Sequence, residues 1–341
     1  VVVVKTEYTN DDDDKGEVFL PLQFFAGKYH LEEVKVPDGF IGLGKTQSFE
    51  MSGLLDFSKD EDGDPIYTVT VIDEQPKGSV HLTKTVDDLD TDTDLVDRSD
   101  LSKIQFVLKA KDDIYSPVDG SLMFAKDEKI TTENSGAVVN TGTEIGKGIY
   151  ALSKDGQLDI SNMYMGTGEA KYYFEEVKKL DGCVLDENKH TFTFKQKDFT
   201  TKNYSKELNI ENKTTHFNCN KTDVTGDKEV LGAQLTITDE KGNVIDQWSS
   251  TDKPHSIEGL VVGKTYTLSE TVTAKDYVKA TDIRFTVKNS SELETVTMKD
   301  KQVSFTKTDV TGEKEVEGAT ITVKEKETGK VIDEWTSTKE S

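Results

Sequence analysis

Lysine side chains occupy positions where the strand pattern places core residues. In three short alternating segments, two apolar residues are followed by a lysine in the same phase. Alternate side chains of a strand share a face, so each lysine is expected to point to the buried side. The segments are Val80/Leu82/Lys84, Phe217/Cys219/Lys221 and Val303/Phe305/Lys307. A lone buried ammonium group is costly, so each of these lysines needs a partner.

Carboxyl and carboxamide side chains repeat in the same manner on two further kinds of segment. The glutamate segments are Tyr29/Leu31/Glu33, Tyr172/Phe174/Glu176 and Tyr266/Leu268/Glu270. The segments that end in Asp or Asn are Val69/Val71/Asp73, Leu208/Ile210/Asn212 and Val296/Met298/Asp300. Because lysine, glutamate and Asp/Asn recur in this chain order, we expect the three side chains of a set to meet.

Such a set can form a covalent bond without a separate enzyme. Burial lowers the pKa of a lysine and raises that of a carboxyl group, which favours a neutral, nucleophilic amine beside a protonated acid. The acid polarises the acceptor's carbonyl group and moves protons, while the fold supplies proximity. The product is an amide between two side chains, with loss of ammonia from Asn or of water from Asp. The alternative is that each lysine extends its ammonium group to solvent at a strand end and each glutamate is a solvated charge at the rim. The recurrence of lysine, glutamate and Asp/Asn in the same order favours bond formation.

Internal repeats show which elements position these residues. Lys221–Gly226 returns as Lys307–Gly312, and Val244–Asp246 with Trp248 returns as Val331–Asp333 with Trp335. The repeats predict four units: 1–77, the C-terminal part of a unit; 78–213, an enlarged unit; 214–301, a complete unit; and 302–341, the N-terminal part of another. The chain is thus expected to be an internal piece of a longer tandem array. Short connections without Pro- or Ser-rich linkers favour a semi-rigid rod.

Strand signals dominate within the units. Alternating Thr, Val and Ile segments are broken by Gly, Asp and Asn turns, which is typical of antiparallel β-sandwiches. The fold class is therefore all-β, with tandem immunoglobulin-like sandwiches. The enlarged unit has extra segments between Asp112 and Gly166, expected to be loops or a small helix.

Composition excludes several functions. The net charge of −23 would repel nucleic acid. No apolar run is long enough to span a membrane. The two cysteines, Cys183 and Cys219, fall in different units and do not form a disulfide framework. The five histidines lack the spacing of metal ligands, and we expect no metal and no cofactor.

Two acidic runs resemble calcium loops superficially. Asp88, Asp90, Asp92 and Asp94 alternate, as do Asp60, Asp62 and Asp64. Neither run has the glycine and glutamate of an EF-hand at the required spacing. Both runs are interpreted as solvated acidic turns.

The repeated pattern resembles the Cna B-type, or SpaA-like, isopeptide-forming domains of Gram-positive surface proteins and pilins. Lys-x-Asp ends the first strand at Lys221/Asp223 and Lys307/Asp309. The Tyr-x-Leu/Phe-x-Glu segment resembles the E-box of pilins. Its copies run over Tyr29–Phe40, Tyr172–Cys183 and Tyr266–Tyr277.

The resemblance implies particular cross-links. They are Lys84–Asn212 assisted by Glu176 and Lys221–Asp300 assisted by Glu270. Glu33 would be the assisting glutamate of the first unit and Asp73 its acceptor, without their lysine; Lys307 would lack its glutamate and acceptor. The enlarged unit departs from the pattern in having Thr85-Val86-Asp87 after Lys84. Asn289 competes with Asp300 as acceptor for Lys221, but it aligns with Gln196, which favours Asp300.

The resemblance also implies a function. The chain would be a structural stalk of a cell-wall-anchored surface protein or pilin-like adhesin on a Gram-positive bacterium, and not an enzyme. Its partners would be neighbouring domains of the same polypeptide, with sortase, the cell wall and a host surface ligand as further candidates. One alternative is a ligand-binding adhesin region centred on the 78–213 unit. Another is that the units are accessory modules of a large secreted enzyme.

Overall fold

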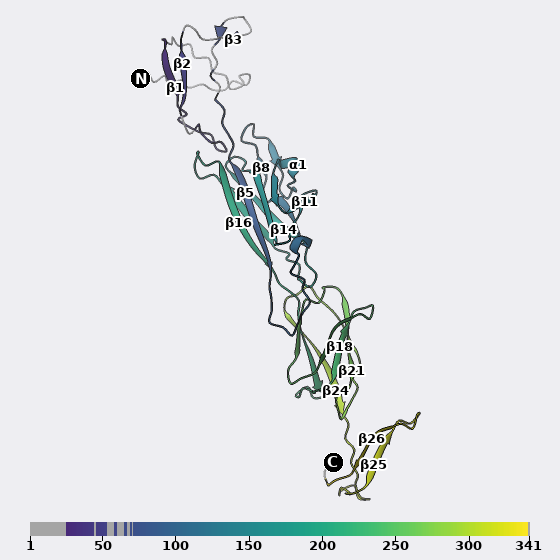
Figure 1. Ribbon diagram of the computed structural model, residues 1–341. Helices are drawn as coiled ribbons and strands as arrows, with labels where there is room; N and C mark the ends of the chain where they lie inside the picture. The colour runs from purple at the N-terminus through teal and green to yellow at the C-terminus, as the bar shows by residue number, and fades with distance from the viewer. Residues whose placement is uncertain are drawn as a thin grey trace.

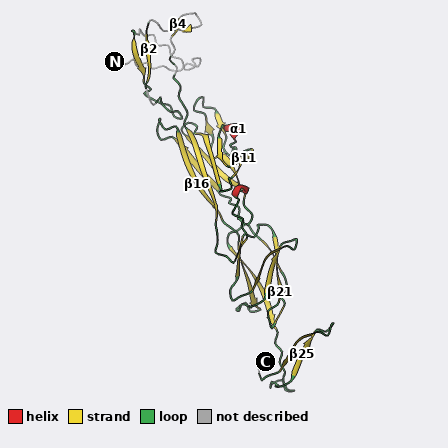
Figure 2. Cartoon of the chain, viewed as in Figure 1, coloured by secondary structure: helices red, strands yellow, loops and turns green. Residues whose placement is uncertain are grey.

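The computed structural model describes residues 25–43, 46–52, 58–59, 65–66, 69 and 71–339. Within these residues the regular structure is almost entirely β-strand, which confirms the all-β prediction (Figures 1 and 2). The exceptions are a 3-10 turn at Leu101–Lys103 and the short helix α1 at Thr132–Ser135. The acidic run of Asp60, Asp62 and Asp64 lies outside the described residues.

The first sandwich is built from strands between Lys77 and Asn212. One sheet has the order β10-β13-β5-β16 and the other β11-β12-β7-β14-β15. The strands are β5 (Lys77–Val86), β7 (Gln105–Ala110), β10 (Val138–Thr141), β11 (Thr143–Gly146), β12 (Ile149–Ala151), β13 (Gln157–Tyr164), β14 (Glu169–Lys178), β15 (Lys189–Lys195) and β16 (Asn203–Asn212). The predicted extra segments contain α1, the hairpin β8 (Ile114–Tyr115) and β9 (Leu122–Phe124), and also the sheet strands β10 to β13.

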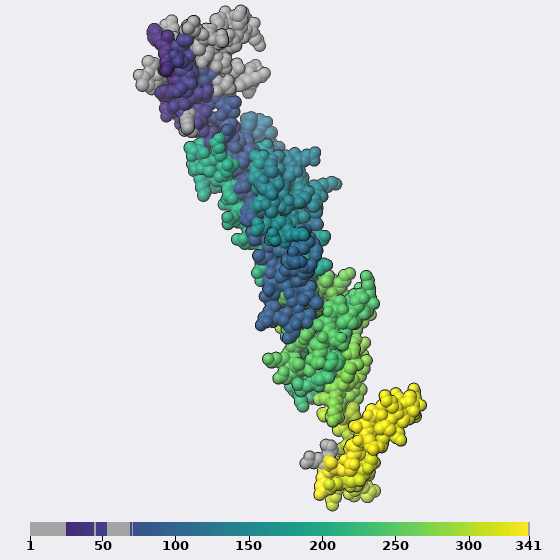
Figure 3. Space-filling view, in the orientation of Figure 1, coloured from purple at the N-terminus to yellow at the C-terminus, as the bar shows by residue number. Residues whose placement is uncertain are grey.

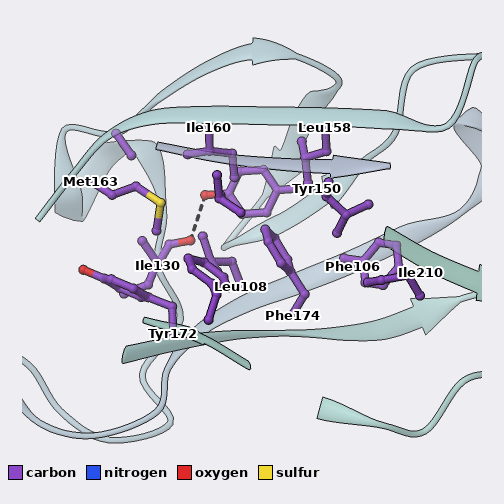
Figure 4. Packing of buried hydrophobic residues seen from close by; sticks show 14 of the residues in the cluster. Phe106, Leu108, Ile130, Tyr150, Leu158, Ile160, Met163, Tyr172, Phe174 and Ile210 are labelled. Carbon is purple, nitrogen blue, oxygen red and sulfur yellow. Dashed lines mark hydrogen bonds between the residues drawn. The ribbon is translucent and has the colours of Figure 1, made fainter. Parts of the chain in front are cut away.

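An aromatic-rich core fills the space between these two sheets. Phe106 and Phe174 pack edge to face, with ring centroids 6.1 Å apart. Tyr150 is fully buried, and its hydroxyl donates a hydrogen bond of 2.8 Å to the carbonyl oxygen of Ile130 (Figure 4). The buried phenol therefore retains a partner, as a polar group in a dry core requires.

The second sandwich follows directly. Its sheets have the orders β22-β24-β17-β20-β6 and β19-β18-β21-β23. The strands are β17 (His216–Asp223), β18 (Gln234–Thr238), β19 (Val244–Ser249), β20 (His255–Glu258), β21 (Thr265–Val272), β22 (Tyr277–Val278), β23 (Ile283–Thr286) and β24 (Leu293–Gln302). The remaining strand, β6 (Thr93–Asp94), comes from the preceding unit.

The pairing of the first and last strands differs from the antiparallel prediction. Strands β5 and β16 are parallel neighbours, and so are β17 and β24. Lys84 lies opposite Ile210 and Lys221 lies opposite Met298. In both sheets the predicted acceptor therefore lies two residues beyond the position opposite the lysine, on the same face.

The segments at the two ends of the chain are less complete. They contain β1 (Gly27–Leu31), β2 (Gln47–Met51), β3 (Ser58–Lys59), β4 (Pro65–Ile66), β25 (Thr320–Lys324) and β26 (Val331–Thr336). The predicted strands that end at Asp73 and Lys307 are wrong, because residues 71–73 and 303–307 adopt no strand. Strand β17 is held between β20 and β24, whereas no strand in the described residues pairs with 303–307. Phe305 accordingly stays 56% exposed.

Candidate cross-linking sites

Strand alternation turns two of the lysines into the cores. Along β5, residues of the Lys84 phase are buried from Gly78 onward, and β17 has the same pattern up to Lys221. Lys84 and Lys221 are each only 1% exposed. The apolar residues that precede each lysine anchor the strand, and the lysine follows them inward because successive side chains alternate.

The enlarged unit brings Lys84, Glu176 and Asn212 together. Lys84 Nζ donates to Asn212 Oδ1 at 2.5 Å and lies 3.9 Å from Glu176 Oε1. Asn212 Nδ2 donates to Glu176 Oε1 at 2.8 Å. The acceptor amide is thus held between the amine and the acid. All three side chains are buried.

Burial sets the protonation states in this site. Desolvation lowers the pKa of Lys84, opposed by the smaller attraction of Glu176. Desolvation likewise raises the pKa of Glu176, opposed by the hydrogen bond from the Asp186 amide and by Lys84. Both shifts favour the neutral amine and the neutral acid over the ion pair.

The second sandwich forms the equivalent site from Lys221, Glu270 and Asp300. Lys221 Nζ is in close contact with Asp300 Oδ1 and lies 3.2 Å from Glu270 Oε1. Asp300 Oδ2 is buried and forms no hydrogen bond. Desolvation raises the pKa of Asp300, opposed by Lys221, and Glu270 adds to the rise. This shift favours the neutral acid form of Asp300 beside the amine.

A backbone contact that the sequence analysis missed orients each glutamate. The Oε2 atom accepts a hydrogen bond from the amide ten residues later in the chain. These contacts are Glu33 to Leu43 at 3.0 Å, Glu176 to Asp186 at 2.9 Å and Glu270 to Ala280 at 2.8 Å. The other carboxyl oxygen of Glu176 and of Glu270 is left to face the lysine. The feature of the sequence that could have predicted this contact is the turn residue, Gly or Asp, six positions after each glutamate.

That turn places a left-handed residue at the same point in all three copies. Gly39, Gly182 and Asp276 have φ values of +89°, +83° and +69°. A left-handed residue reverses the chain so that the later amide returns to the carboxylate. The repeated glutamate is therefore part of a repeated loop, which we call the glutamate loop and define as residues 33–43, 176–186 and 270–280.

The glutamate loops also locate the acceptor positions. Val184 N donates to Lys213 O at 2.8 Å, one residue after Asn212. Ile41 N donates to Glu74 O at 2.8 Å, one residue after Asp73. Asp73 therefore lies beside its glutamate loop as Asn212 lies beside the loop of the enlarged unit, and its Oδ1 atom is buried without a hydrogen bond.

Lys307 and Asn289 lie apart from the two complete sets. Lys307 is exposed and donates to the carbonyl oxygen of Thr308 at 3.3 Å. Asn289 is exposed, and its Oδ1 accepts from Leu185 N of the preceding unit at 3.0 Å. Asp300, and not Asn289, is the residue in contact with Lys221.

The cysteines take no part in these sites. Cys183 and Cys219 are buried free thiols. Burial raises the pKa of each to about 12, which keeps them protonated and unreactive.

The fold and the buried sets together define a protein of tandem β-sandwiches with a lysine–carboxyl site in each complete unit. Residues 215–302 match the model of the SpaA family, described as a prealbumin-like fold domain. This match confirms the family resemblance for this stretch and agrees with the sandwich fold. No curated protein matches the chain.

Several solved structures resemble the chain. The TIE protein of Bacillus anthracis is 18% identical, with 86% of this chain and 45% of that chain covered and a TM-score of 0.34. The shaft pilin SpaA from Lactobacillus rhamnosus GG is 14% identical, with 67% and 99% covered and a TM-score of 0.26. A streptococcal ancillary pilin is 17% identical, with 82% and 76% covered and a TM-score of 0.25. The chain thus spans less than half of the TIE protein.

No helix in the described part of the chain is long and apolar enough to cross a membrane.

Proposed function

We propose that this chain is part of the stalk of a Gram-positive surface protein or pilin-like adhesin, stiffened by self-formed isopeptide bonds. The bonds join Lys84 to Asn212 and Lys221 to Asp300. The observation that carries the proposal is that a lysine, a glutamate and an acceptor are buried together twice, in the same strand register. The chain would act extracellularly, anchored to the cell wall through sortase, and it would have no external substrate.

In the enlarged unit the reaction starts from the neutral pair. Lys84 Nζ attacks Cγ of Asn212, while the carboxyl group of Glu176 donates a proton to the amide. The amine then loses its proton to Glu176. When the Cγ–Nδ2 bond breaks and the carbonyl group re-forms, the acyl oxygen returns to Glu176 the proton that it received, so the acid ends protonated as it began. Nδ2 leaves as ammonia after it has taken a proton from the same acid. The contact of 2.8 Å between Nδ2 and Glu176 Oε1 suits this last transfer. Asn212 lines a cleft of about 340 Å³, through which ammonia can leave.

The second site needs the same steps with water as the leaving group. Lys221 Nζ attacks Cγ of Asp300 from the side of Oδ1, and Oδ2 leaves as water once it has been protonated. Oδ2 has no hydrogen bond that would hold it. Glu270 is the proton donor and acceptor, oriented by the amide of Ala280 at 2.8 Å.

Intact mass of the purified chain tests the proposal. The wild-type mass is expected to fall short of the sequence mass by one ammonia and one water. Glu176→Ala should restore the ammonia alone, and Glu270→Ala the water alone. Glu175→Ala is the matched control, because Glu175 precedes the site residue but is paired with Lys109 at 2.9 Å outside the core. A full sequence mass for the wild-type chain would refute the proposal.

One observation favours a second function, that of a ligand-binding region in the enlarged unit. Large apolar side chains of its insertion are exposed, among them Val118 at 70% and Leu122 at 51%. Exposed apolar groups of this size are a feature of interaction surfaces. Deletion of 114–124, the β8–β9 hairpin, should abolish adhesion to host surfaces if this function holds, and should leave adhesion unchanged if the unit is only a spacer.

A further inference from the structure

The loop that follows the lysine strand contacts the next unit. Residues 87–100, which we call the strap, connect β5 to the 3-10 turn Leu101–Lys103. Within the strap, β6 pairs in parallel with β20 of the following sandwich. In Figure 3 the blue surface of this region meets the green surface of the following unit. Pairing over two residues contributes little stability by itself. The side-chain contacts therefore determine whether the two units are held in a fixed orientation.

Arg98 is the centre of this junction. Its Nη1 donates to Asp94 Oδ2 at 2.6 Å, and its Nε and Nη2 donate to the carbonyl oxygen of Asp87 at 2.9 and 2.7 Å. Nη2 also pairs with Oε1 of Glu258, a fully buried residue of the following unit. Oε2 of Glu258 accepts from the amide of Leu89 in the strap at 2.9 Å. The buried carboxylate of one unit is thus neutralised by a guanidinium group of the other.

These contacts replace the sequence interpretation of the acidic run. Carboxylate oxygens of Asp88, Asp94 and Glu258 lie within 4.8 Å of one another. The guanidinium group of Arg98 lies among them and supplies the opposite charge, at 3.9 Å from Asp88. The run is therefore not simply a solvated turn, because its Asp88 and Asp94 carboxylates form ion pairs with Arg98.

Reciprocal hydrogen bonds extend the contact on either side. Asp92 Oδ2 accepts from both N and Oγ of Ser256 at 2.8 Å, and Asp92 N donates to Ser256 Oγ at 2.9 Å. Asp87 Oδ1 accepts from the amide of Thr214 at 2.8 Å.

The glutamate loop of the enlarged unit forms the other side of the junction. Thr215 N donates to Gly182 O at 3.0 Å, and Leu185 N donates to Asn289 Oδ1 at 3.0 Å. A Cβ atom at Gly182 would lie 2.6 Å from the carbonyl oxygen of Gly259, so the two backbones approach as closely as only glycine allows.

The preceding junction uses the same device. Gly39 N of the first glutamate loop donates to Gln196 Oε1 at 3.0 Å, and Gln196 Nε2 donates to Phe40 O at 2.7 Å. Gln196 and Asn289 occupy aligned positions in their units. At both junctions, therefore, a side-chain amide forms a hydrogen bond with the glutamate loop of the preceding unit.

We propose that the strap and the glutamate loop dock the 214–301 unit onto the 78–213 unit, so that the two move as one rigid body. The contacts combine an ion pair between the partly exposed Arg98 and the buried Glu258, a glycine-dependent backbone approach and hydrogen bonds from both flanks. The interface goes beyond the proposed cross-linking and does not require it, because none of its contacts includes an atom that changes in the reaction. Arginine is needed at position 98 because its planar fork reaches Asp94, Glu258 and Asp87 at once.

Distance measurement on the full chain tests the interface. Nitroxide labels on Lys206→Cys and Lys241→Cys place one probe on each unit at exposed positions, whereas the native cysteines are buried. Double electron–electron resonance should give one narrow distance distribution. Arg98→Ala should broaden it and should speed hydrogen exchange at the Leu89 amide by on the order of 100-fold, because the buried Glu258 loses its counter-charge.

Two controls separate docking from folding and from cross-linking. Arg284→Ala removes the chain's other arginine, which is exposed, and should leave the distribution narrow. If Arg98→Ala does not fold, Asp92→Ala serves instead, because it removes the Ser256 contacts and leaves the ion pair of Arg98 with Glu258 in place; it too should broaden the distribution. The intact mass should show the same cross-linking deficit in all of these variants. A broad distance distribution in the wild-type chain would overturn the proposal. So would strap variants that keep a narrow distance distribution and an unchanged rate of hydrogen exchange at the Leu89 amide.

Discussion

Replacement of Glu176 by glutamine is predicted to prevent the proposed Lys84–Asn212 bond and to remove the stability expected from it. Glutamine preserves the shape of the side chain and can still accept from the Asp186 amide, but it cannot carry the proton between amine and acceptor. Lys84 and Asn212 are 128 residues apart in sequence. By the chain-entropy relation for cross-links, a closed loop of that length stabilises the fold by about 4.9 kcal/mol.

The effect is large enough for calorimetry. For a unit of this size, about 5 kcal/mol corresponds to a fall in Tm on the order of 15 °C. Intact mass should show that the variant retains its ammonia, and calorimetry should show the lower transition. Glu175→Gln, which changes the neighbouring glutamate outside the core, should change neither quantity. A variant that keeps the mass deficit, or that loses the deficit at an unchanged Tm, would refute the assigned role of Glu176.

Three further predictions concern the two sandwiches. Without the cross-link, the Glu176→Gln variant should gain stability as pH rises from 7 toward the ordinary lysine pKa, because burial lowers the pKa of Lys84 and the unfolded chain then binds more protons than the folded chain. Urea unfolding at several pH values measures this gain. The cross-linked wild type should lack it, because an amide nitrogen does not titrate. Asp300→Asn should keep its cross-link but lose ammonia in place of water, so that the intact mass shows a deficit of two ammonias. Gly78→Ala should destabilise the enlarged unit by about 1–3 kcal/mol in urea unfolding, because the new Cβ would lie 2.4 Å from the ring of Phe194.

The sequence was sufficient to predict which way the lysines point. Alternation along β5 and β17 identifies a buried face, and Lys84 and Lys221 share its phase. It was not sufficient to predict the parallel pairing of first and last strands, because a strand alternates in the same way whichever direction its neighbour runs. The predicted strand at 303–307 was wrong because the alternating pattern does not show whether a neighbouring strand is present. The residues alternate as a strand would, but no strand in the described residues pairs with them.

Contacts made by backbone atoms or by another unit were also beyond the reach of the sequence. The amide of Asp186 that orients Glu176 has no residue type to mark it. Asp92 and Asp94 look like residues of a solvated turn because nothing near them in sequence is basic except Arg98. Their partners Ser256 and Glu258 lie in the following unit, more than 160 residues later. Composition alone cannot distinguish an acidic surface from an acidic interface.

The parallel arrangement leads to a prediction about tension. The chain enters the enlarged sandwich along β5, which carries Lys84 near its C-terminal end, and it leaves just after Asn212 at the same end of the parallel neighbour β16. With the proposed bond in place, force applied to the two ends runs along β5, through the side-chain amide and out along the chain after Asn212. The 128-residue separation between Lys84 and Asn212 then carries none of this force. At about 3.4 Å per extended residue, those residues would add roughly 430 Å on unfolding. Single-molecule stretching of the wild-type chain should lack a step of this length, and the Glu176→Gln variant should show it. The Glu270→Gln variant should show a shorter step of roughly 270 Å, because Lys221 and Asp300 are 79 residues apart. A full-length step in the wild type would mean that the enlarged unit extends under load as an ordinary sandwich does, with no covalent bypass.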